Sequence, residues 1–166
     1  MNNIMFLGAK RCGKSTIIDA LRTLLSEKGY SVVPLNKHDS IEEVIAQSQC
    51  EYDCILLEGA ELADVKIADM ADASVVLVGD IERGGVFAVL YGTYALLKGQ
   101  RISGFLVNKF RGDGKLLEPG LLFLEEKTGV PFVGVVPYVS ARDEFIEIFR
   151  MSVELDVISK ILGADL

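Results

Sequence analysis

A glycine-rich segment between an apolar run and a helical pattern constrains the fold of this chain most. Residues 8–16 read GAKRCGKST, the pattern G-x-x-x-x-G-K-[ST], and follow the apolar run 4–7 directly. Apolar side chains then recur at helical spacing as far as Leu25. Glycines at these positions let successive backbone N–H groups converge on phosphate oxygens, and the helix adds the positive end of its dipole. The segment predicts a phosphate-binding loop between a strand and a helix.

The positions of this loop have distinct expected roles. Gly8 and Gly13 permit the turn, Lys14 would contact the β- and γ-phosphates of a nucleoside triphosphate, and the Ser15 hydroxyl would ligate Mg²⁺. The alternative is a glycine-bearing turn whose lysine is only solvated. The expected nucleotide-binding residues of the segment are Gly8, Arg11, Cys12, Gly13, Lys14, Ser15 and Thr16.

Composition excludes several classes of protein. With 166 residues the chain is expected to form a single domain over 1–166 with a sizeable core. Half of its residues are hydrophobic, which suits strands covered on both faces. No apolar run approaches the roughly 20 residues that span a bilayer, and the N-terminus lacks a signal-peptide pattern. The net charge of −7 argues against nucleic acid as the partner. We therefore expect a cytoplasmic protein that binds neither membrane nor nucleic acid.

The cysteines and the single histidine narrow the chemistry. Cys12, Cys50 and Cys54 form no C-x-x-C pair, and Cys50 and Cys54 are expected to be small core residues. His38 is the one histidine, which removes histidine metal clusters and argues against a Ser/His/Asp triad.

Strand and helix patterns alternate along the whole chain. Strands are expected over 3–7, 30–34, 53–57, 73–78, 103–108 and 132–136. Helices are expected over 14–28, 41–48 (with Asp39 or Ser40 as its N-cap), 86–97, 116–128 and 142–162. The last of these would be one structural helix that covers the sheet. Such alternation predicts an α/β three-layer sandwich with a mostly parallel sheet, whose ligands lie beyond the carboxyl ends of the strands.

Two strand ends carry candidate residues for a nucleotide and its metal. Glu58 follows the apolar strand 53–57 and is expected to be the second Mg²⁺ partner beside Ser15, and a catalytic residue together with Lys14. Its alternative is a solvated loop carboxylate. Asn108 ends another strand, where its amide could read a purine edge, and Pro137 could border the base.

The loop after residue 78 contains two glycines and a charged cluster. Asp80, Arg83 and Gly84 are expected to approach a substrate or a partner subunit, the alternative being that Asp80 and Arg83 only cap the next helix.

Several segments resemble the synthetase domain of cobyric acid synthase. They are VVLVGDIERGGVFAVLYGT at 75–93, NKFRGD at 108–113, LLEPGL at 116–121, EEKTGVP at 125–131 and GVVPY at 134–138. The resemblance implies the P-loop fold of the dethiobiotin synthetase-like superfamily. It also implies ATP and Mg²⁺ as cofactors, activation of corrinoid carboxylates as acyl phosphates, and ammonia delivered by a glutamine amidotransferase. A homodimer formed through the region after the fourth strand is implied as well.

The chain also departs from that family. Only residues 36–51 fill the place of a long family segment, Glu61 stands where the family has glycine, and the phosphate loop is one residue shorter. No amidotransferase domain is expected in the chain, so ammonia would come from another protein. Two hypotheses follow: an ATP-dependent ligase-like enzyme acting on a small carboxylate, or an ATPase module that switches its association with a protein partner without ligase activity.

Overall fold

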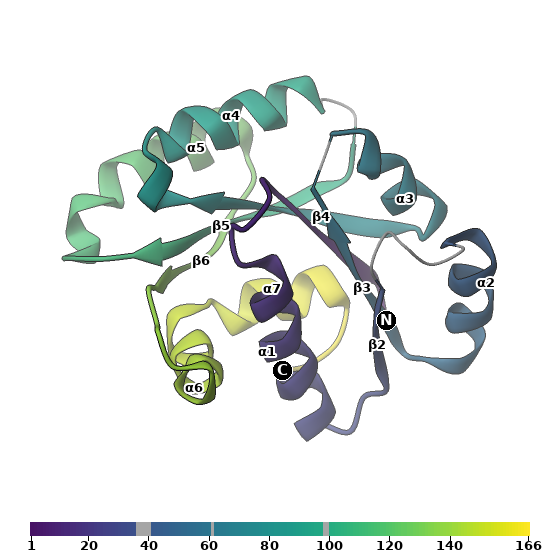
Figure 1. Ribbon diagram of the computed structural model, residues 1–166. Coiled ribbons are helices and arrows are strands. Elements are labelled where there is room, and N and C mark those ends of the chain that lie inside the picture. The colour runs from purple at the N-terminus through teal and green to yellow at the C-terminus, as the bar shows by residue number, and fades with distance from the viewer. Residues whose placement is uncertain (36–40, 61, 98–99) are drawn as a thin grey trace.

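A twisted parallel sheet forms the centre of the molecule (Figure 1). The computed structural model describes residues 1–35, 41–60, 62–97 and 100–166. In these ranges the strands are β1 (Asn3–Leu7), β2 (Val32–Leu35), β3 (Cys54–Gly59), β4 (Ala73–Asp80), β5 (Ile102–Phe110) and β6 (Phe132–Pro137). Their order is β2-β3-β1-β4-β5-β6, and all neighbours run parallel. The predicted α/β fold is confirmed.

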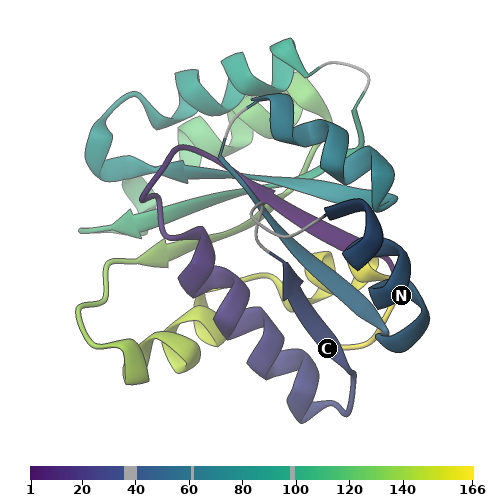
Figure 2. The ribbon, with the colours of Figure 1, turned by 45° about the vertical axis from the view of Figure 1, so that its right-hand side comes forward.

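Helices cover both faces of the sheet (Figure 2). One face packs against α1 (Lys14–Glu27), α6 (Arg142–Ser152) and α7 (Leu155–Leu162). The other packs against α2 (Ile41–Glu51), α3 (Val65–Met70), α4 (Val86–Leu96) and α5 (Glu118–Thr128). Successive strand side chains enter opposite layers, as Ile4 and Met5 of β1 do. This double coverage is why the strands read as continuous apolar runs.

The centre of the sheet places the end of β1 beside the ends of its two neighbours. Leu7 lies opposite Gly59 of β3 on one side and Leu77 of β4 on the other. Asp80 of β4 in turn pairs with Asn108 of β5. All of these strand ends point to one edge, and ligands of doubly wound sheets bind where neighbouring connections diverge at that edge.

The C-terminal helix predicted over 142–162 is interrupted. The two residues between α6 and α7 have extended backbone, with Val153 at φ −115° and ψ 148°. Val153 forms an antiparallel bridge with Gly134, and the backbone N–H of Glu154 donates to Val133 O at 2.8 Å. β6 is an edge strand, so its free backbone groups offer these residues partners that a continuous helix would not use.

Other boundaries differ less. The short 3₁₀ turn Leu62–Asp64 and α3 occupy a stretch that was not predicted as helical, and α3 buries Val65 and Ala68 against the sheet. Asp39, Ser40, His38 and Glu61 lie outside the described residues, as does the side chain of Cys50. Cys54 is buried, as expected. No helix among the described residues is long and apolar enough to cross a membrane.

Candidate functional site

The loop between β1 and α1 requires glycine at both glycine positions of the sequence pattern, residues 8 and 13. Gly13 precedes α1 with φ +93°, a left-handed conformation that side chains disfavour. A Cβ on Gly13 would also collide with the Asn108 amide, and a Cβ on Gly8 would collide with the Val78 carbonyl. Glycine therefore lets the loop pack directly against the ends of β4 and β5.

Lys14 holds the first two carbonyl groups of the loop. Its ammonium donates to Gly8 O and to Ala9 O, each at 2.9 Å, and lies 3.6 Å from the Cys12 sulfur. The Lys14 side chain is 2% exposed. An ammonium group folded back over the loop in this way already lies at the place where a polyphosphate would enter.

The next three carbonyls of the loop accept hydrogen bonds from side chains at the ends of β4 and β5. The pairs are Arg83 Nη2 to Lys10 O at 2.6 Å, Lys109 Nζ to Arg11 O at 2.7 Å and Asn108 Nδ2 to Cys12 O at 2.9 Å. Five consecutive carbonyls, from residue 8 to residue 12, are thus each bound by a side-chain donor. The carbonyls of Gly8 and Ala9 point toward the Lys14 ammonium, whereas those of residues 10–12 are held by side chains at the ends of β4 and β5. Because the C=O and N–H of a trans peptide unit point in opposite directions, the second set favours N–H groups that face a ligand in the loop.

Ser15 and Glu58 meet beside Lys14, as the sequence predicts. The Ser15 hydroxyl donates to Glu58 Oε2 at 2.7 Å, and Lys14 Nζ lies 3.8 Å from Glu58 Oε1. Ser15 is in the first turn of α1 and Glu58 is near the end of β3. Hydroxyl and carboxylate oxygens are ligands that suit Mg²⁺, which usually binds one or two protein groups together with phosphate oxygens and water. The pair fits such an ion.

Asp80 lies buried under the loop rather than at an open surface. Its carboxylate accepts from Lys109 Nζ at 2.8 Å and Arg83 Nε at 3.3 Å, and also from the backbone N–H of Glu82 at 3.1 Å. Burial by itself raises the pKa of the Asp80 carboxyl, but the hydrogen bond and charge of Lys109, with the other donors, bring the pKa below its ordinary value. The carboxylate is therefore charged at neutral pH.

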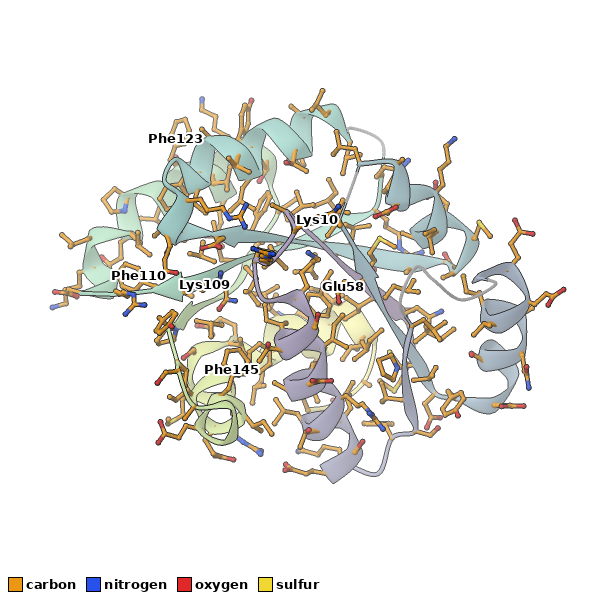
Figure 3. The ribbon with its side chains drawn as sticks, in the orientation of Figure 1. Lys10, Glu58, Lys109, Phe110, Phe123 and Phe145 are labelled. Atoms are coloured by element: carbon orange, nitrogen blue, oxygen red, sulfur yellow. The ribbon has the colours of Figure 1, made fainter. Side chains whose placement is uncertain are left out.

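Lys109 was not singled out by sequence reasoning. It occupies a left-handed conformation at φ 63°, as does Arg11 at φ 65°, and neither is glycine. The two residues are joined by the bond from Lys109 Nζ to Arg11 O. Strained backbone of this kind persists where surrounding contacts hold it, often at functional sites. The signal in the sequence was its position directly after Asn108 at a strand end. Figure 3 labels Lys109 close to the loop that carries Lys10, with Glu58 nearby.

The expected base-contacting residues lie on the β5 and β6 side of the loop. Asn108 is 3% exposed, and its Oδ1 atom is buried without a hydrogen-bond partner among the described residues. Pro137 is exposed and pairs in register with Phe110 of β5. Beside them the Arg111 guanidinium stacks over the Tyr138 ring at 3.6 Å.

The remaining predicted residues line cavities beside the loop or lie buried within it. Thr16 lines a groove of about 450 Å³ between α1 and α6. Gly84, with Arg83 and Asp80, lines a cavity of about 140 Å³ that also contacts Gly8. Cys12 is fully buried, and burial raises the pKa of its thiol despite the neighbouring lysine.

Comparisons with known proteins agree with this geometry. Residues 10–147 match the family model described as "CobQ/CobB/MinD/ParA nucleotide binding domain". Cobyric acid synthase from a Geobacillus strain is 46% identical over 134 residues, covering 72% of this chain and 25% of the relative. The Anoxybacillus flavithermus cobyric acid synthase is 53% identical over 106 residues, covering 55% and 21%. The chain thus spans about a quarter, or less, of the length of these relatives.

Solved structures share the fold at low sequence identity. The signal recognition particle receptor FtsY from Elizabethkingia anophelis has a TM-score of 0.65 at 16% identity, covering 89% of this chain and 65% of that one. MinD from Aquifex aeolicus has a TM-score of 0.64 at 14% identity, covering 90% and 87%. The glycine loop at the head of α1 and the match over residues 10–147 place this chain in the CobQ/CobB/MinD/ParA family of nucleotide-binding domains.

Proposed function

We propose that this chain binds Mg·ATP and uses its γ-phosphate to activate a carboxylate, as the first half of an amide-forming ligase reaction. The observation that carries this proposal is that side chains at the ends of β4 and β5 hold the carbonyls of residues 10–12 away from the loop interior, next to Lys14, Ser15 and Glu58. The carboxylate chemistry is supported by 46–53% identity to cobyric acid synthases over the matched residues.

Each group near the loop has a role in this proposal. Lys14 would leave the carbonyls of Gly8 and Ala9 and bind the β- and γ-phosphates. Ser15 and Glu58 would hold Mg²⁺, which when bound offsets the charge of the polyphosphate. We propose Lys14 and Glu58 as the catalytic residues, because both lie where the transferred phosphoryl group would be.

We propose Asn108 as the residue that reads the edge of the purine base. One amide hydrogen of Nδ2 binds Cys12 O, which leaves the second N–H and the unpartnered Oδ1. Adenine presents an acceptor at N7 beside a donor at N6, whereas guanine presents two acceptors there. In this structure the amide is buried under the loop, so we propose that it turns toward the ligand when a nucleotide binds; its donor and acceptor would then match adenine, and Pro137 would border the base.

The proposed reaction needs no oxidant or reductant. A carboxylate oxygen of the acceptor attacks the γ-phosphorus, the bond to the β–γ bridging oxygen breaks, and ADP leaves with the electron pair. Ammonia then attacks the acyl carbon, the phosphate leaves and the nitrogen loses a proton, giving an amide. The loop contributes by holding the γ-phosphate in line with the attacking oxygen.

The acceptor is proposed as a small carboxylate or a carboxylate arm of a corrinoid. The cavity of about 140 Å³ next to Gly8 and Arg83 has room for a short arm rather than for a whole corrinoid. Ammonia would come from a separate amidotransferase. Because ATP is abundant in the cytoplasm, we also propose that the protein acts there.

The test is phosphate release from Mg·ATP, measured with and without corrinoid acids, small carboxylates and ammonia. We expect release to depend on an acceptor and hydroxamate to form when hydroxylamine replaces ammonia, since hydroxylamine traps acyl phosphates. Lys14→Ala should abolish both signals. Acceptor-independent release, or hydroxamate formation that persists in Lys14→Ala, would contradict the proposal.

A second candidate function is an ATPase module that switches contact with a protein, including a second copy of itself. The observation that favours it is α4, a helix without a charged residue, where Val89 and Leu96 share one side and are 56% and 73% exposed, and Tyr91 on another side is 44% exposed. Phe123 of the adjoining α5 is 55% exposed and lies on the outer side of that helix (Figure 3). Large exposed apolar patches are typical of interaction surfaces.

Light scattering with ADP and with a non-hydrolysable ATP analogue distinguishes the two candidates. If the protein is a nucleotide-dependent association switch, its molar mass in solution should depend on which nucleotide is bound. Leu96→Glu should remove this dependence. A nucleotide-independent monomer with acceptor-dependent phosphate release would reject it.

A further inference from the structure

Asp80 joins two cations that each reach the phosphate loop. Its Oδ2 atom lies 2.8 Å from Lys109 Nζ and 3.3 Å from Arg83 Nε. The same two side chains bind Arg11 O and Lys10 O. The carboxylate is 4% exposed, whereas Arg83 is 51% exposed and Lys109 25%. A buried anion thus positions two more exposed cations, and each cation positions one loop carbonyl.

We infer that Asp80 is a positioning residue for polyphosphate binding, which holds the phosphate loop in its binding conformation through Arg83 and Lys109. Asp80 does not touch the ligand in this arrangement. It acts by fixing the two donors that turn the carbonyls of Lys10 and Arg11 outward. The inference rests on nucleotide binding by the loop and not on carboxylate activation, so either can fail while the other holds.

Two features of the structure support a positioning role over a merely local ion pair. Asp80 also accepts from the backbone N–H of Glu82, so the turn that carries Arg83 is tied to the same carboxylate. Arg11 and Lys109 both adopt left-handed backbone and are bonded to each other, which requires an external constraint. Removing the anion would leave each cation with a neutral loop carbonyl as its remaining partner, and a cation that has lost its counter-charge is drawn toward water.

The sign of the effect on affinity separates this inference from simple electrostatics. Asp80 is negative and lies near the place of an anionic ligand, so its neutralisation should tighten binding if charge alone matters. If Asp80 positions the loop, its neutralisation should weaken binding. Asp80→Asn keeps the shape of the side chain and gives opposite results under the two explanations.

Two matched variants serve as controls. Glu82→Gln removes a negative charge two residues after Asp80. The Glu82 carboxylate pairs with Arg111, which has no bond to the loop among the described contacts. Asp72→Asn removes an ion pair with Arg101. Asp72 precedes the first residue of β4, whereas Asp80 is the last residue of that strand. We expect Glu82→Gln to leave binding unchanged or slightly tighter, and Asp72→Asn to leave it unchanged.

The measurement is calorimetric titration with Mg·ATP and, separately, with magnesium inorganic triphosphate. In Asp80→Asn, loss of the two charge-assisted hydrogen bonds to the loop is expected to weaken the binding of each ligand about tenfold or more. The factor should be the same for both ligands. Amide hydrogen exchange of loop residues 8–13 should also be faster in the free variant. Unchanged or tighter binding in Asp80→Asn would overturn the inference, as would equal weakening by Asp72→Asn.

If Asp80→Asn does not fold, Arg83→Lys tests the inference instead. It keeps the charge at an exposed position but cannot reach both Asp80 and Lys10 O through one planar group. We expect weaker binding of both ligands with an unchanged melting temperature. Wild-type affinity in Arg83→Lys would then reject the proposed positioning of the loop through Asp80 and Arg83.

Discussion

Individual side chains around the phosphate loop act in two layers. Lys14, Ser15 and Glu58 are the residues that we propose to contact phosphate and metal, whereas Arg83 and Lys109 bind carbonyls of the loop. The first layer provides charge and ligands. The second provides the conformation in which those ligands are useful, because preorganised groups need not rearrange when a ligand arrives.

Glu58→Gln tests the first layer. The amide still accepts a hydrogen bond from Ser15 but loses the charge that holds Mg²⁺, so phosphate release should fall at least about tenfold while ATP affinity falls less. Steady-state kinetics at several magnesium concentrations, with nucleotide titration, measures both. The control is Glu126→Gln, an exposed carboxylate on α5. Equal kinetics in the two variants would make Glu58 a solvated carboxylate.

Asn108→Ala tests base recognition. The variant loses the bond to Cys12 O and the proposed contacts with adenine, so ATP should weaken more than inorganic triphosphate does, by about tenfold or more. Competition titrations with ATP, GTP and triphosphate measure the ratio. Equal loss for all three ligands would restrict Asn108 to a role in loop structure.

Among the elements, β6 shows how an edge strand overrides a helical pattern. The residues from 142 to 162 carry apolar side chains at helical spacing, yet Val153 and Glu154 leave the helix to pair with β6. Gly134 permits this approach, since a Cβ there would meet the Ser152 carbonyl and the Val153 backbone. The break therefore depends on a glycine in another element.

Gly134→Ala should destabilise the protein because the new methyl group has no room. We expect a loss of about 1–3 kcal/mol in the free energy of unfolding, as for other overpacked sites. Gly92→Ala is the matched control: Gly92 lies within α4 with open space around it, so alanine should stabilise by about 0.5–1 kcal/mol. Urea unfolding of both variants measures whether each change raises or lowers the free energy of unfolding. An unchanged stability in Gly134→Ala would show that residues 152 and 153 can move away from β6 at little cost.

At the scale of the whole molecule, the apolar layer under α1, α6 and α7 buries the thiols of Cys12 and Cys54 along with aliphatic side chains. Cys54 is fully buried at the start of β3, and desolvation raises the pKa of its thiol to about 12. In the unfolded chain the same thiol would titrate near an ordinary cysteine pKa of about 8.5. The folded state therefore keeps a proton that the unfolded state releases.

This difference predicts a loss of stability in alkaline solution. Because the folded pKa is raised, the contribution of Cys54 is fully present below about pH 8.5 and is lost as pH rises toward 12, by up to about 1.4 kcal/mol per pH unit. Denaturant unfolding between neutral and alkaline pH should show a steeper decline for the wild type than for Cys54→Ala. Parallel curves for the two proteins would contradict the burial of an intact thiol.

The sequence alone determined the features that local patterns encode. The loop at 8–15, the strand before it and the helix after it were recognisable because glycine freedom, apolar runs and helical periodicity act within about a dozen neighbouring residues. Glu58 was found in the same way, as an acidic residue at the tip of an apolar strand. Parallel strands bring their ends to one edge, so even the meeting of Ser15 and Glu58 followed from the alternation of elements.

The tertiary structure decided which side chains support the loop and where the last helix breaks. The bonds from Arg83, Asn108 and Lys109 to the loop span 73, 96 and 98 residues of sequence. They depend on β4 lying beside β1 and β5 beside β4, an order that periodicity does not encode. The pairing of Val153 with Gly134 depends likewise on β6 being an edge. Local patterns specify the elements, but contacts between distant segments arise only when the packed sheet brings their backbone groups within hydrogen-bonding distance.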